Sequence, residues 1–191
     1  PEGRATRILA LETRIAKDQW TPERRRDPVA THNPMTRAQL MKLAYDFAIV
    51  GDDQPVPLND RPEIADLLAE PDHAKRLAMY AALVVSIDRR ISAIWRALEG
   101  AAASDPEARR LHTTTIRQRR RGMQEAAQLF ADAGALRSDI DADVAADLMW
   151  LYNDPSLYDK LVRQRGWSVA QFQTWLTEAL RVQLLGTTAT P

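Results

Sequence analysis

Glu70 and His73 are the residues whose types and spacing most resemble a reactive site, because they stand in the order Glu-x-x-His. On a helix this spacing puts both side chains on one face, and di-iron bundles bind their metals with two such motifs plus further Glu residues. Here the motif contains Pro71, stands at a predicted helix start and has no second copy. We interpret it as an accidental match and predict no metal site.

The rest of the chain offers few residues for catalysis. With three His and no Cys, neither an activated nucleophile nor a catalytic metal site can be assembled convincingly. Asp141 and Asp143 are spaced as a pair of carboxylates, but their place before an apolar helical stretch is typical of helix-start charges. We predict that the protein is not an enzyme and needs no cofactor.

Arg24, Arg25 and Arg26 form a basic cluster near the N-terminus, and Arg37 follows. Arginines in such a cluster can contact the phosphates of DNA, an interaction that depends on salt and not on base sequence. The alternative is a solvated basic loop. The formal net charge of the chain is zero, so the charge balance permits a nucleic-acid partner without requiring one.

A second basic run, residues 117–121, falls in the middle of a predicted long helix. Its arginines cannot all face one way, so most of them should be solvated. Arg117 could turn inward as a partner for an anion, but the general scarcity of buried arginine favours a solvated side chain.

Apolar and aromatic residues on the inward faces of the middle helices are candidates for a small-molecule pocket, with a few polar groups to orient the ligand. His112 and Trp150 stand out because both carry polar atoms that need partners when buried. The alternative is that all of these residues form ordinary core, since protein interiors leave few voids. The candidate ligand residues are Tyr80, Val84, Ile87, Trp95, His112, Ile116, Met123, Met149 and Trp150.

Helix start and stop signals predict the elements that would position these residues. Thr36 and Gln39 form a possible capping box that opens a helix to about Val50, and Gly51 stands where its C-terminal cap would lie. From Asp72 onward, apolar residues at steps of three and four predict one long amphipathic helix. Its apolar residues are Leu77, Tyr80, Val84, Ile87, Ile91, Ile94 and Leu98.

The segment 104–107, Ser-Asp-Pro-Glu, combines a cap residue, a first-turn proline and a matching Glu, and predicts a second long helix to about Ala133. A third helix, from Asp141 to Tyr152, has Val144, Leu148 and Leu151 on one face. No segment alternates as a half-buried strand does. The sequence therefore predicts an all-α bundle.

The C-terminal stretch 153–176 contains two helix breaks. Asn153, Asp154 and Pro155 end one helix and start the next, while Gly166 and Ser168 do the same further on. The last helix carries one apolar stripe at Val169, Phe172, Leu176, Leu180 and Leu184, and a second at Trp175, Val182 and Leu185. Because a terminal helix on its own domain needs one apolar face, the surplus favours burial against another copy of the chain. The alternative is a helix threaded through its own core.

Length and composition indicate a globular protein without a membrane span. The 191 residues suffice for one domain with a substantial core, or for a small domain joined to a larger one. Hydrophobic residues make up 45% of the chain, and no apolar run approaches the ~18 residues that a membrane span needs. The absence of cysteine excludes disulfides and suits a reducing compartment. We predict no membrane partner and a cytoplasmic location.

The segment DVAADLMWLYNDPSLYDKLVRQRGWSVAQFQTWLTEAL, residues 143–180, resembles the C-terminal part of tetracycline-repressor (TetR) family regulators. The similarity is carried by AADLMW leading into DPSLYDKLV, and by RGWS before an aromatic-rich last helix. Upstream, AYDFAIVGDDQPVPL, ISAIWRALEGAAASDPEARRL and RRRGMQEAAQLFADAGALRSDIDADVAADLMW follow in the family's usual order. The resemblance covers roughly residues 38–185.

This resemblance implies a homodimeric transcriptional regulator whose C-terminal helical domain encloses a pocket for a small-molecule effector. It also implies that the last two long helices, here residues 154–165 and 168–185, pair with their copies in a four-helix interface. Carried over to this sequence, the dimer contacts are Leu157, Leu161, Phe172, Trp175, Leu176 and Ala179.

The N-terminal part departs from the family pattern. RILALETRIAKDQW could stand for the first helix of a helix-turn-helix domain, but TPERRRDPVATHNPM holds three prolines and no Gly, Tyr or Phe. A recognition helix needs several uninterrupted turns to reach base edges. We therefore predict a remnant or atypical DNA-binding region at 1–46, a ligand-binding and dimerisation domain at 47–186, and a tail at 187–191. The alternative function is a ligand-binding and dimerisation module that has lost specific DNA binding.

Overall fold

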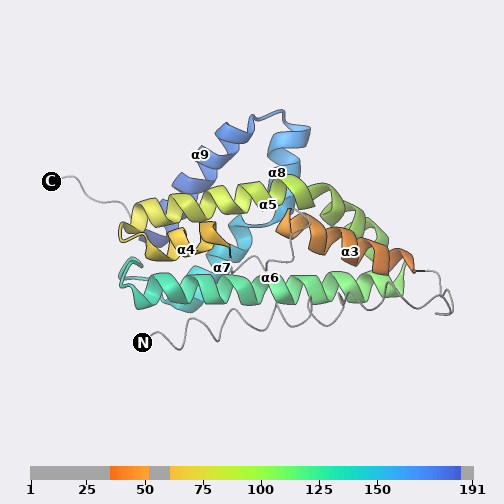
Figure 1. The fold of residues 1–191 in the computed structure, drawn as a ribbon, viewed down its shortest axis with the longest axis horizontal. Coiled ribbons are helices and arrows are strands. Elements are labelled where there is room, and N and C mark those ends of the chain that lie inside the picture. The colour runs from red at the N-terminus through yellow and green to blue at the C-terminus, as the bar shows by residue number, and fades with distance from the viewer. Residues whose placement is uncertain (1–34, 52–60, 186–191) are drawn as a thin grey trace.

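The structure, a computed structural model, describes residues 35–51 and 61–185. Within these two ranges every regular element is a helix, which confirms the predicted all-α class (Figure 1). None of the helices described is long and apolar enough to cross a lipid bilayer.

Two long antiparallel helices, α5 (His73–Ala102) and α6 (Pro106–Asp132), form the frame of the bundle (Figure 1). The shorter helices α3 (Arg37–Val50) and α4 (Pro62–Ala69) pack on α5, and α7 (Ala142–Tyr152) packs chiefly on α6. The C-terminal elements then cover α5 from another side. They are α8 (Pro155–Tyr158), the π-helix η3 (Asp159–Gln164), α9 (Val169–Leu180) and the π-helix η4 (Arg181–Leu185).

The first helices begin and end at the predicted signals. Thr36 and Gln39 make the reciprocal bonds of a capping box at the start of α3. Gly51 ends that helix with φ of 90°, a left-handed conformation that costs glycine little. Asp72 caps α5 by accepting hydrogen bonds from the amides of Ala74 and Lys75. These bonds satisfy amide groups that have no partner inside the helix.

The later caps also match the sequence, with one shift. Asp105, and not Ser104, accepts the first amides of α6, with Pro106 as the first helical residue. Asp154 caps α8 before Pro155. Ser168 caps α9 after Gly166, which has φ of 78°. The predicted helix, turn, helix arrangement of residues 153–176 is therefore present.

Arg90, on α5, binds the C-terminal end of α3. Arg90 donates from Nε to the carbonyl oxygen of Ala48 at 2.6 Å and from Nη2 to that of Ile49 at 2.9 Å. A positive charge at a helix C-terminus interacts favourably with the helix dipole. A Cβ atom on Gly51 would approach Arg90 Cζ to 2.9 Å, so another residue here would displace the Arg90 side chain from these carbonyls.

The buried side of α7 differs from the apolar face seen in its sequence. Val144 and Leu151 are 45% and 55% exposed, whereas Ala145, Ala146 and Met149 are buried. Small alanine side chains let the backbone of α7 lie close to α6, its main neighbour. The larger residues consequently point away from the core of the chain.

The main hydrophobic core joins α5, α7 and α9. Leu77, Met149, Phe172 and Leu176 are among its fully buried members, and Tyr158 packs edge-on against Phe172 at 5.3 Å between ring centroids. A second cluster of Tyr45, Ile91 and Trp95 attaches α3 to α5. Because α3 is unbroken from Arg37 to Val50, the domain boundary predicted after residue 46 falls inside a helix.

Leu176→Ala should lower the free energy of unfolding by about 2–5 kcal/mol, because Leu176 is completely buried and its truncation leaves a cavity in the main core. The matched control is Leu129→Ala on α6, where the side chain is 37% exposed and the expected change stays near 0.5 kcal/mol. Urea denaturation of both variants measures the difference. Equal losses would contradict the assigned core.

Candidate ligand site and dimer face

Polar side chains gather in the interior between α5, α6 and the end of α7. We call this group the interior polar cluster. Its members are Tyr80, Asp88, Arg119 and Asn153, together with Met123, whose sulfur atom lies among them. Asp88 and Asn153 are only 3% and 5% exposed. Buried polar side chains are costly unless they are paired, so their arrangement is informative.

Hydrogen bonds connect four of these residues. The side-chain amide of Asn153 donates to the Tyr80 hydroxyl and lies 2.7 Å from Met123 Sδ, and the Tyr80 hydroxyl is 3.1 Å from the same sulfur. Arg119 donates from Nη2 to the carbonyl oxygen of Asn153 at 2.8 Å. Arg119 thereby contacts the residue that ends α7.

Contacts between tilted aromatic rings extend the interior polar cluster toward α3. The Arg119 guanidinium lies 5.0 Å from the ring centroid of Trp95, a cation–π distance. The centroid of the Trp95 ring is 4.9 Å from that of His112 and 6.3 Å from that of Tyr45 on α3. The interior polar cluster and α3 are therefore joined through a short series of side-chain contacts.

Asp88 is the buried acidic residue of the interior polar cluster. Burial raises the pKa of its carboxyl to about 8, and the charge of Arg119 opposes that rise while the charge of Asp154 adds to it. At neutral pH Asp88 is therefore mostly protonated and can donate a hydrogen bond as well as accept one. Burial also raises the pKa of Tyr80 above its usual range.

Several buried polar atoms in this part of the bundle have no hydrogen-bond partner among the described residues. They are Asp88 Oδ2, Trp95 Nε1, His112 Nε2 and Asn153 Oδ1, together with Trp150 Nε1 on α7. Native proteins satisfy nearly all buried polar groups, and the natural partners of such atoms are ordered water or a bound ligand. The set offers both donors and acceptors to a small polar molecule.

The structure brings some of the predicted ligand residues together and separates others. Tyr80, Trp95, His112 and Met123 lie in or against the interior polar cluster. Val84 and Met149 belong to the main apolar core, and Ile87 and Ile116 pack on the second core cluster. Trp150 is half-buried on α7.

The sequence missed Asp88, Arg119 and Asn153. Asp88 falls on the apolar stripe of α5, a full turn after Val84, and that position is a signal for a buried carboxyl group. The arginine that turns inward is Arg119, whereas Arg117 is exposed, so the alternative of an inward Arg117 does not hold. Periodicity alone does not distinguish the two, because the choice depends on where Trp95 lies.

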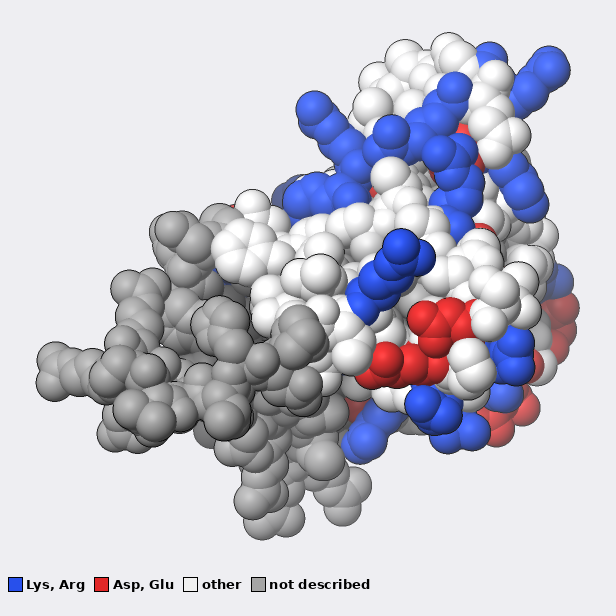
Figure 2. Space-filling model, turned by 90° about the vertical axis from the view of Figure 1, so that its right-hand side faces the viewer, with Lys and Arg blue, Asp and Glu red and all other residues white. Residues whose placement is uncertain are grey.

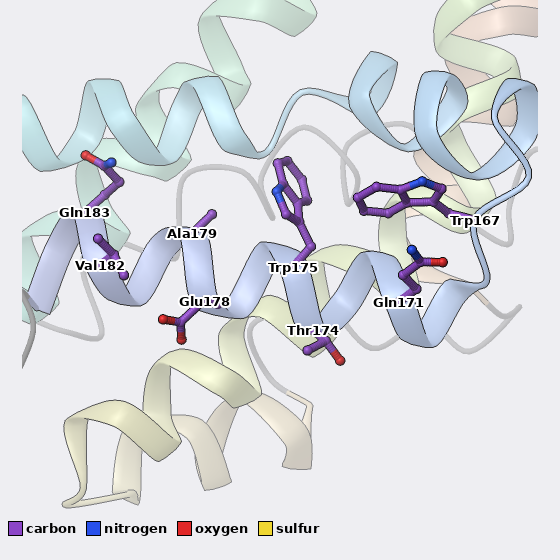
Figure 3. A pocket seen from close by; sticks show the side chains of 8 residues that line it. All are labelled: Trp167, Gln171, Thr174, Trp175, Glu178, Ala179, Val182 and Gln183. Carbon is purple, nitrogen blue, oxygen red and sulfur yellow. The ribbon is translucent and has the colours of Figure 1, made fainter.

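Helix α9 has apolar residues on two sides that differ in burial. Phe172, Leu176, Leu180 and Leu184 are completely buried against the chain's own core. The other side borders an open groove of about 720 Å³. Figure 3 shows its lining residues along α9, with Trp167 beside Trp175. They are Trp167, Gln171, Thr174, Trp175, Glu178, Ala179, Val182 and Gln183.

Two predicted dimer contacts were wrong. Phe172 and Leu176 are fully enclosed by their own chain, because the stripe that they share faces the main core. Trp175 and Ala179 do line the groove, and Trp175 keeps edge-on contacts with Trp167 and Tyr152, each at 6.1 Å. Leu157 and Leu161 are half-buried against the main core.

The predicted DNA-binding residues are only partly described. Arg24, Arg25 and Arg26 lie outside the described residues. Arg37 is exposed at the first position of α3. In the Glu-x-x-His motif, Glu70 accepts from the Asp72 amide and pairs with Lys75 at 2.6 Å, and neither contact involves His73.

Comparison with known proteins finds no matching family model, no similar curated protein and no similar solved structure.

Raising the pH should destabilise the protein through Asp88. An unfolded Asp titrates near pH 3.9, so between about pH 4 and 8 the folded state holds a proton that the unfolded state has lost. The contribution of Asp88 therefore falls across this window and stays level above it. Asp88→Asn cannot titrate, so the variant should gain stability over the parent as pH rises.

Urea denaturation at pH 5 and pH 8 tests this effect on both proteins. The difference between variant and parent isolates Asp88 from other groups that titrate in the same window. A difference that does not change with pH would show that Asp88 keeps an ordinary pKa.

Proposed function

We propose that the protein is a dimeric transcriptional regulator of the TetR type, whose DNA binding is controlled by a small-molecule effector in the interior polar cluster. One observation carries the proposal. Helix α9 is completely buried along one apolar side and borders an open, mostly apolar groove along the other. Such a helix has more apolar surface than one chain covers.

A second copy of the chain is the simplest cover for the groove. Two α9 helices related by a twofold axis would place the same side chains against each other, as in isologous interfaces. Trp175 and Ala179 supply a large aromatic anchor beside a small residue, a combination that permits close helix approach. The exposed Val144 and Leu151 of α7 offer further apolar surface for such contact.

The interior polar cluster supports the effector site. It lies between three helices, and it offers unpartnered donors and acceptors to a ligand. Trp95 connects it to Tyr45 of α3, the helix that follows the basic N-terminal segment. An effector that binds one position of α3 better than another would shift the population of states and so change DNA affinity.

The resemblance of residues 38–185 to TetR regulators supports the DNA-binding part of the proposal, together with the basic cluster at residues 24–26. The three prolines of TPERRRDPVATHNPM favour the second candidate function. In that case the protein is a ligand-binding and dimerisation module without specific DNA binding. The two functions share the groove and the interior polar cluster, and they differ in DNA recognition.

Ala179→Arg should convert the dimer to a monomer, because two copies of the new charge would face each other in a desolvated groove. The control is Gln124→Arg, which adds the same charge to an exposed position of α6. Sedimentation equilibrium at micromolar concentration measures the mass of each. A monomeric parent, or dimers of both variants, would overturn the assigned interface.

Selection of duplexes from a random DNA library should recover a palindromic sequence, because a twofold dimer reads two half-sites. Compounds that raise the melting temperature of the chain are then tested for release of the selected duplex. Recovery of a palindrome together with release supports the regulator. If the dimer persists but no sequence is enriched, the second candidate function replaces the first.

A further inference from the structure

A dense group of positive side chains covers the region where α8 and η3 meet the middle of α5, and Figure 2 shows Lys and Arg gathered on the upper part of the molecule. We call this group the basic ridge. It consists of Arg89 and Arg96 on α5, Lys160 and Arg163 on η3, and Arg165 directly after η3. None of these residues belongs to the interior polar cluster or lines the groove.

Arg96 and Arg163 of the basic ridge are held in place by the buried carboxylate of Asp159. Arg96 Nη1 bonds to Asp159 Oδ2 at 3.3 Å, and Arg163 Nε lies 3.9 Å from Asp159 Oδ1. Arg163 also donates to the Ser92 hydroxyl at 3.2 Å and to the Arg89 carbonyl at 3.3 Å. The two side chains remain 64% and 43% exposed. Anchored guanidinium groups lose less side-chain freedom when they bind an anion.

The charges of the ridge are poorly balanced. Asp159 is the carboxylate beneath it, and its side chain is only 5% exposed. Five cations against this one carboxylate leave an excess of four positive charges. Glu99, a turn beyond Arg96 on α5, lies at the edge and has no ion pair with any described ridge residue. An anionic partner would offset this excess of positive charge.

Arg89, Lys160 and Arg165 are exposed, and within the described part of the chain their side chains have neither hydrogen bonds nor ion pairs. These three cations are therefore available to a partner without breaking any internal contact.

We propose that the basic ridge binds the sugar–phosphate backbone of double-helical DNA, independently of base sequence. Four of its five cations are arginines, whose planar donors match phosphate oxygens. Arg89 and Arg96 are separated by about 10 Å along α5 at 1.5 Å per residue. Measured along the axis of the duplex, that length corresponds to about three base-pair steps at 3.4 Å each.

Other anionic partners fit the ridge less well. An amphipathic helix at a membrane surface inserts apolar side chains beside its cations, and none of the exposed large hydrophobic residues described lies on the ridge. Protein partners bind through aromatic and apolar anchors that the ridge lacks. Single-stranded nucleic acid is bound by stacking on aromatic side chains, which favours the duplex here.

The test compares the full chain with the triple variant Arg89→Gln, Lys160→Gln, Arg165→Gln. Binding of a random-sequence 20-base-pair duplex is measured by fluorescence anisotropy between 50 and 200 mM salt. Losing three phosphate contacts should reduce the slope of log affinity against log salt by about 2.7. Over this fourfold range of salt, binding by the variant should therefore weaken about 40-fold less than binding by the parent.

The matched control removes three exposed cations of α6 with Arg110→Gln, Arg117→Gln and Arg120→Gln, and it should retain the parent's slope. Equal slopes for parent and ridge variant, or equal losses in both variants, would overturn the proposal. So would binding to phosphatidylserine vesicles or polyglutamate in place of DNA. Because the duplex has no selected sequence, failure here leaves the regulator function intact, and failure of that function leaves the ridge intact.

Discussion

Helix α5 contacts α3, α4, α6, α8 and α9, more elements than any other helix described in this chain. A helix with neighbours on several sides must bury whatever its sequence places there, and α5 buries Asp88 and Ser92 along with its apolar residues. The surrounding elements supply an arginine near each of these two groups. Arg119 of α6 acts on Asp88, and Arg163 of η3 donates to Ser92. The placement of α6 and η3 around α5 is thus tied to polar groups as much as to apolar packing.

The polar contacts buried around α5 are separate from the two surfaces that could bind partners. The contacts from Tyr45 to Arg119 run through the interior and end at the α7–α8 turn, where Asn153 and Asp154 lie. The groove of α9 and the basic ridge are both outside this series of contacts. A ligand in the interior, a second copy on α9 and a polyanion on the ridge would therefore occupy separate parts of one chain.

Local signals in the sequence placed the helices well. Caps such as Thr36, Asp72 and Asp154 act within a few residues, so their hydrogen bonds can be predicted without knowing the fold. Burial could not be predicted in the same way. Whether α7 turns Ala145 or Leu151 inward depends on the surface of α6, and the choice between Arg117 and Arg119 depends on the ring of Trp95. The candidate site was therefore found in part, with its aromatic residues expected and its carboxyl group missed.

The hold of Arg90 on the last carbonyls of α3 has a geometric consequence. Arg90 fastens one end of the helix near Ala48 and Ile49, and at the other end the Thr36 hydroxyl donates to Glu107 of α6 at 3.0 Å. The helix α3 is thus tied to α5 at one end and to α6 at the other. Its 14 residues extend for about 20 Å, so a tilt of about 5° displaces the opposite end by roughly 2 Å. A small tilt at Tyr45 would therefore displace Thr36, and with it the hydrogen bond to Glu107 of α6, more than it displaces Tyr45 itself.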